Sequence, residues 1–163
     1  MYHNYRYRPY PDYGWHDYPD WECHMHLRDY GPNPFVINIE EAAKQNKYFR
    51  LALWTGTYYQ LTLMSIDVGS DIGLEVHPDV DQFIRIEQGQ GMVMMGHRKD
   101  CLPFRRRVGK GDVIFIPAGS WHNLINIGNV PIKLYSIYAP PEHPHGTVHR
   151  TKEEAEMEDG DYL

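Results

Sequence analysis

The sequence predicts an all-β fold, in which short strands form a sandwich or a closed barrel. Between residues 48 and 139, runs rich in β-formers are separated by Gly- and Pro-containing turns. No helical pattern alternates with these runs, as a parallel sheet would require. The expected strands cover residues 58–68, 72–77, 82–87, 92–95, 113–116, 121–126 and 132–138.

A short helix is expected before the first strand. Asn38 can accept a hydrogen bond at the start of this helix, and Glu41 follows three residues later, as in a capping box. Residues 40–46 are rich in helix formers. The folded part of the chain is therefore expected to begin with a helix.

Both ends of the chain differ from this middle part in composition. Residues 1–34 hold seven tyrosines, two tryptophans and five prolines but few aliphatic side chains, so they cannot bury a core alone. Residues 141–163 are polar and become acidic. We therefore predict a low-complexity extension over 1–34, a barrel over 35–140 and a tail over 141–163, with exposed histidines at 143, 145 and 149.

Composition narrows the possible partners. A chain of 163 residues favours one domain, and a formal net charge of −6 argues against nucleic acid. The basic residues Arg105, Arg106 and Arg107 are interpreted as an exposed strand. No apolar run is long enough to cross a bilayer, and no apolar signal segment is present. We expect no membrane partner and a cytoplasmic location.

Four side chains are candidates for one polar site inside the barrel. Glu75 and His77 lie two residues apart, so on a strand they share one face. Gln82 follows directly after the Pro78-Asp79 turn, and His122 follows a turn that contains Gly119. Charged groups inside a barrel must be paired or bound to metal. This mixture of nitrogen and oxygen ligands suits a divalent first-row metal.

Two stretches, residues 69–89 and 111–126, resemble the two signature motifs of the cupin superfamily. The first keeps the family's spacing, but it has Glu75 in place of the first histidine and Gln82 in place of the glutamate. The second is matched at Gly111, Pro117, Gly119, His122 and Asn126. The resemblance implies a double-stranded β-helix, the cupin jelly-roll barrel, over about residues 50–140.

The resemblance also implies one metal ion, held by Glu75, His77, Gln82 and His122. The two replacements leave the charge of the ligand set unchanged, because one residue of the set is still an anion. It is similar to the zinc site of phosphomannose-isomerase-like cupins, with positions permuted, and its acid and two histidines resemble the triad of non-haem iron oxygenases. Zn, Mn, Fe and Ni all remain open. So does a metal-free barrel, in which Gln82 is a buried amide and His122 bonds to Glu75.

Three functions are compatible with this site. The first is an isomerase that acts on a sugar or hydroxy-carbonyl compound and uses the metal as a Lewis acid. His97 is a weak candidate for its base, whereas Trp121, Tyr135 and Tyr138 are expected to serve packing. The second is an Fe- or Mn-dependent dioxygenase. The third is a binding or structural protein, for example of a spore coat. The family implies a small-molecule substrate and a homodimer formed through edge strands.

Overall fold

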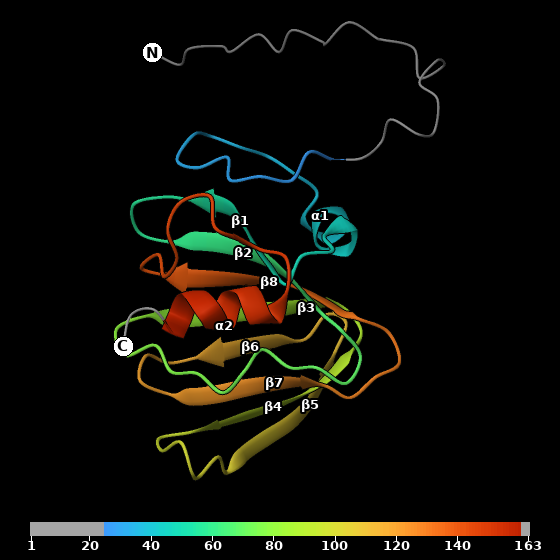
Figure 1. The fold of residues 1–163 in the computed structure, drawn as a ribbon, viewed down its shortest axis with the longest axis vertical. Coiled ribbons are helices and arrows are strands. Elements are labelled where there is room, and N and C mark those ends of the chain that lie inside the picture. The colour runs from blue at the N-terminus through green and yellow to red at the C-terminus, as the bar shows by residue number, and fades with distance from the viewer. Residues whose placement is uncertain (1–24, 161–163) are drawn as a thin grey trace, which may run out of the picture.

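The computed structural model describes residues 25–160 (Figure 1). In this part the strands form a six-stranded and a three-stranded sheet, and all neighbouring strands are antiparallel. The larger sheet has the order β6-β3-β8-β2-β1-β9. Its strands are β1 (Arg50–Thr55), β2 (Gln60–Ile66), β3 (Asp81–Gln88), β6 (Val113–Ile116), β8 (Ile132–Ala139) and β9 (Val148–His149). The smaller sheet contains β5 (Phe104–Gly109), β4 (Gln90–Gly96) and β7 (Trp121–Asn126).

This arrangement confirms the all-β jelly-roll prediction. In Figure 1, β1, β2 and β8 occupy the upper part of the barrel, and β4, β5 and β7 the lower part. The helix α1 (Ile39–Gln45) precedes β1, and the Asn38 side chain accepts a hydrogen bond from the Glu41 amide at 3.2 Å. The cap is therefore the expected one. Arg105, Arg106 and Arg107 lie exposed on β5, as predicted.

One predicted strand is irregular. Residues 72–77 do not form a continuous strand but join β7 through isolated bridges at Asp71 and Glu75. Gly73 has a φ of 89°, and the Asp71 carboxylate accepts a hydrogen bond from its amide at 2.6 Å. This Asx turn interrupts the ladder, because a positive φ is incompatible with an extended strand.

The inner faces of the strands divide the barrel into an apolar and a polar part. The apolar part is a core cluster that includes Ile66, Ile84, Ile86, Leu124, Ile132 and Leu134. In the polar part, strand alternation turns another set of buried side chains inward, and this set consists of Gln60, Thr62, Gln82, Ser136 and Tyr138. Buried polar groups require partners, so this half of the interior is where a ligand is expected.

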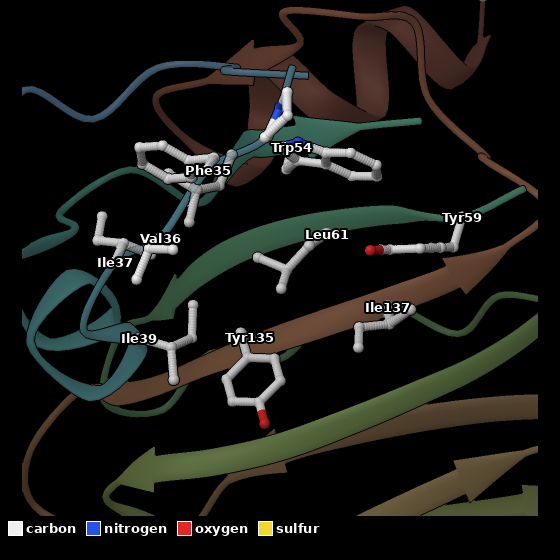
Figure 2. A pocket seen from close by; sticks show the side chains of 11 residues that line it. Phe35, Val36, Ile37, Ile39, Trp54, Tyr59, Leu61, Tyr135 and Ile137 are labelled. Carbon is white, nitrogen blue, oxygen red and sulfur yellow. The ribbon is translucent and has the colours of Figure 1, made fainter. Parts of the chain in front are cut away.

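The outer face of the same sheet carries an apolar groove (Figure 2). Strands β1, β2 and β8 form its floor, and residues 34–39 form one wall. Figure 2 shows Leu61 and Tyr135 on this face. Their neighbours in sequence, Thr62 and Ser136, point to the interior, as alternation along a strand requires. The groove has a volume of about 710 Å³ and lies on the side of the sheet opposite to the polar interior. It contains no titratable cluster and belongs to the second apolar cluster, around α1.

Residues 141–160 contain regular structure. The strand β9 pairs with β1, and the helix α2 (Lys152–Gly160) follows it. The pairing places His149 inside, at 4% exposure, so the prediction of an exposed His149 is wrong. His143 is partly buried, whereas His145 is exposed as expected. No helix in residues 25–160 is long and apolar enough to cross a membrane.

The Asp29 carboxylate connects the segment before the barrel to the segment after β8. Of the predicted extension 1–34, residues 1–24 lie outside the described part of the chain. Residues 25–34 lie beside β1, where the Tyr30 amide donates to the Leu53 carbonyl. The Asp29 side chain accepts hydrogen bonds from the amides of Gly31, Thr55 and Gly146, each at 2.9 Å. It also accepts one from the Thr55 hydroxyl at 2.5 Å. Asp29 thereby ties residues before the barrel to β1 and to the segment that follows β8.

Replacing Asp29 by asparagine should lower the free energy of unfolding by about 2 kcal/mol, because an amide nitrogen would then face the donors that the carboxylate now satisfies. Chemical denaturation measures this change. The matched control is Asp79→Asn, at an exposed position. Equal stability of the two variants would contradict the role assigned to Asp29.

Candidate metal centre

Glu75, His77 and His122 meet at one point in the polar part of the barrel. The Glu75 carboxylate oxygen Oε1 lies 3.4 Å from Nε2 of His77 and 3.3 Å from Nε2 of His122. The potential ligand atoms of all three residues lie within 4.8 Å of one another. Both imidazoles are buried, and the carboxylate is 21% exposed. Such a group of two nitrogens and one oxygen could hold a metal ion.

Backbone contacts determine where these side chains lie. The amides and carbonyls of Glu75 and His122 exchange two hydrogen bonds, at 3.0 and 2.9 Å, so the two residues lie directly opposite each other. The Gly119 amide donates to the His77 carbonyl at 2.8 Å. Gly119 has a φ of 79°, which side chains rarely adopt, and this explains why glycine stands in the turn before β7.

The outer nitrogens of the two histidines already have partners. Nδ1 of His77 lies 3.0 Å from the Glu142 carboxylate, and Nδ1 of His122 lies 2.9 Å from the Ser120 carbonyl. Each acceptor favours a proton on Nδ1, so in the neutral ring the lone pair is on Nε2. Among the described residues, neither Nε2 atom has a hydrogen-bond partner. The tautomers and the unpartnered nitrogens therefore fit a bound metal.

The charges in the group compensate one another. Burial alone would raise the pKa of Glu75, but the adjacent His122 and His77 imidazoles outweigh burial and hold this pKa well below its usual range. Burial would lower the pKa of His77, yet the Glu142 and Glu75 carboxylates raise it to about 9. Without metal, His77 is therefore protonated at neutral pH, and its charge balances Glu75.

Gln82 lies in the same polar interior, on β3, and is 3% exposed. Its amide nitrogen donates to the Ser136 hydroxyl at 2.9 Å. Its carbonyl oxygen is buried and has no hydrogen-bond partner within residues 25–160. A neutral oxygen without a partner is available as a further ligand. The alternative of a fully satisfied amide does not match this arrangement.

A cavity of about 450 Å³ adjoins the three residues, and Glu75 and His77 form part of its wall. Residues after β8 form the rest, namely Glu142, His143, Pro144, His149 and Glu158. Sequence reasoning assigned these residues to a tail and missed them. No strand periodicity could have found Glu142 and His143, because they lie between prolines in an irregular segment.

Two other candidates lie outside the centre. His97 is exposed in the turn after β4 and does not line the cavity, so it is unsuited to act as a base there. Asn126 donates to the backbone carbonyls of Ile66 and Val130, at 3.0 and 2.9 Å. These hydrogen bonds close the end of β7.

Comparison with known proteins places this geometry in a family. Residues 62–138 match the Cupin domain family. The uncharacterized protein YrkC of Bacillus subtilis is 64% identical over 129 residues, which are 79% of this chain and 69% of YrkC. The crystal structure of BH2720 from Bacillus halodurans has a TM-score of 0.80 at 61% identity, over 80% of this chain and 99% of that chain. This chain belongs to the cupin superfamily.

More distant structures share the fold of this cupin. A Klebsiella pneumoniae protein with a double-stranded beta-helix domain has a TM-score of 0.56 at 16% identity, over 73% of this chain and 100% of that chain. This cupin departs from the family motif at Glu75 and Gln82. Its acid therefore stands two residues before His77 and directly opposite His122 on the neighbouring strand.

Metal binding to this cupin should release a proton, because His77 must lose the proton that its carboxylate neighbours stabilise. Between pH 7 and the His77 pKa of about 9, the affinity for Zn²⁺ should rise about tenfold per pH unit. Calorimetric titration of the metal-free protein in buffers of different ionisation enthalpy counts the protons released. A pH-independent affinity with no proton release would contradict the charge balance described above.

Proposed function

We propose that this cupin binds one divalent metal ion through Glu75, His77 and His122, with Gln82 as a further ligand, and acts on a small chelating molecule. The reaction that we propose is isomerase-type chemistry on a sugar or another hydroxy-carbonyl compound. One observation carries the proposal: two buried imidazole nitrogens, neither with a hydrogen-bond partner among residues 25–160, face the same carboxylate oxygen.

The cavity supports a small substrate. Its volume of about 450 Å³ lies in the range of small-molecule sites. The bound ion would supply Lewis acidity for polarising a carbonyl group. Glu142 would keep His77 oriented through its Nδ1, and Ser120 would do the same for His122. The apolar half of the barrel would exclude water from the inner side of the site.

Removing a proposed ligand should remove the metal. His122→Ala should empty the centre, since only one imidazole would remain beside the Glu75 carboxylate and the weakly binding Gln82 amide. Gln82→Ala should weaken binding less, because a neutral amide oxygen is a poorer ligand than an imidazole. Elemental analysis of protein purified without chelator or nickel resin measures the metal content. His97→Ala, at an exposed histidine, is the control. Full occupancy in the His122 variant would refute the ligand assignment.

The proposed chemistry moves a proton between neighbouring carbons, so it should leave an isotopic trace. Metal-loaded protein in deuterated water should exchange the carbon-bound hydrogens of hydroxyacetone or glyceraldehyde, and NMR follows this exchange. The metal-free protein and the His122→Ala variant should show only the background rate. Background exchange across a panel of hydroxy-carbonyl compounds would count against the isomerase proposal.

The dioxygenase alternative is favoured by one specific observation, which is that two histidines and one carboxylate form the group. This donor set is typical of non-haem Fe(II) oxygenases. An oxygen electrode separates the two functions. Oxygen uptake by Fe(II)-loaded protein with a catechol, flavonol, thiol or diketone would support the oxygenase. Uptake should disappear when a chelator removes the iron.

A further inference from the structure

Arg50 is a buried cation without a direct counter-charge. It begins β1, where alternation turns it toward the barrel interior, and it is 2% exposed. Its Nη1 lies 3.2 Å from Nδ1 of His149, whose Nε2 contacts Glu158 at 2.5 Å. Within residues 25–160, no carboxylate forms an ion pair with Arg50, and its Nε has no hydrogen-bond partner. Buried charges are normally paired. The charge of Arg50 helps to lower the pKa of Glu75, but Glu75 is assigned to the proposed metal, so a second anion is missing here.

Two more polar atoms without partners lie in the same part of the interior. The Tyr138 hydroxyl and Nε2 of His143 are buried and, within the described chain, make no hydrogen bond. The two rings meet edge to face, with centroids 5.1 Å apart. The charge of Arg50 acts on both side chains: it reinforces the lowering of the His143 pKa and partly opposes the raising of the Tyr138 pKa by burial. The three residues therefore surround one small polar region.

This region adjoins the proposed metal centre. The Tyr138 ring also meets the His77 ring edge to face, at 5.6 Å between centroids. His143 and His149 line the cavity together with Glu75 and His77. A molecule bound at the metal would therefore reach His143 within the same cavity. Tyr138 and Arg50 do not line the cavity but lie directly behind two of its walls, Tyr138 against His143 and Arg50 against His149.

His143 is held firmly in this position. Gln60 is fully buried, and its side-chain amide binds the backbone of His143 on both sides. Its oxygen accepts from the His143 amide at 3.0 Å, and its nitrogen donates to the His143 carbonyl at 2.9 Å. The same nitrogen also donates to the Thr55 hydroxyl at 2.9 Å. A buried side chain that binds both backbone polar groups of one loop residue preorganises that residue for contact with a ligand.

The protonation states leave Arg50 as the cation of this region. Burial, reinforced by the charge of Arg50, lowers the pKa of His143 to about 3, so its ring is neutral. The Tyr138 hydroxyl carries a proton and can donate it in a hydrogen bond. One positive charge with neutral hydrogen-bonding neighbours matches a monoanion.

We propose that Arg50, Tyr138 and His143 form a carboxylate subsite, so that the molecule that chelates the metal is a hydroxy acid or an oxo acid. The inference rests on the proposed function, because it places a second anchor point beside the proposed metal centre. A carboxylate is favoured over a phosphate dianion. The carboxylates of Glu142 and Glu158, which are 31% and 47% exposed, line the same cavity and would repel a higher charge.

Matched ligands test the subsite. Calorimetry compares the affinities of zinc-loaded protein for glycolate and lactate with those for ethylene glycol and propane-1,2-diol, which have a hydroxymethyl group in place of the carboxylate. Zinc itself prefers carboxylates, so the informative quantity is how each variant changes the acid-to-diol affinity ratio. Arg50→Gln should lower this ratio tenfold or more, and Tyr138→Phe should lower it about threefold. Arg98→Gln, at an exposed arginine, should leave it unchanged.

The remaining results of these experiments either support or overturn the carboxylate subsite. Tyr138→Phe removes only a buried hydroxyl without a partner, so it should fold with unchanged or higher stability. If Arg50→Gln does not fold, Arg50→Lys and Tyr138→Phe carry the test. Unchanged ratios in the folded variants, or no binding of either acid to wild-type protein, would overturn the subsite. Acid binding that persists in His122→Ala but falls in the Arg50 variant would instead overturn the metal centre and leave the subsite standing.

Discussion

The need to neutralise one largely enclosed carboxylate organises the functional half of this cupin. Glu75 faces two imidazoles, and without metal the proton on His77 balances its charge. A divalent ion would take over that role. The turn at Gly119, the paired backbones of Glu75 and His122, and the contact between Glu142 and His77 all hold the same three side chains together. The three side chains are thus already held in place for the proposed cation.

The division of the interior explains how stability and function coexist in a small barrel. The aliphatic cluster around Ile84 and Leu134 supplies the hydrophobic burial that holds the sheets together. The other half contains several buried polar atoms that have no partner in the described part of the chain. Such atoms lower stability and are rare in proteins unless a ligand or water satisfies them. Native sequences accept such local costs mainly at functional sites.

Much of the fold could be predicted because its signals are local. Strand alternation and Gly- and Pro-containing turns located most strands, and Asn38 located the helix start. Glu75, His77 and His122 were found because motif spacing is local too. The rest depends on contacts between distant residues: Arg50 meets His149 across 99 positions, and His77 meets Glu142 across 65. The strand expected at 72–77 failed because Gly73 adopts a positive φ there.

Strands β2 and β8 contribute side chains to both faces of the sheet. Leu61 and Tyr135 line the outer groove, whereas Thr62 and Ser136 point inward. Inserting or deleting a single residue in either strand would exchange these sets, placing hydroxyls in the groove and an aromatic ring in the polar interior. Length variation among homologues in these two strands should therefore be confined to their ends. The groove and the polar interior then evolve as a coupled pair, since neither surface can shift its register without the other.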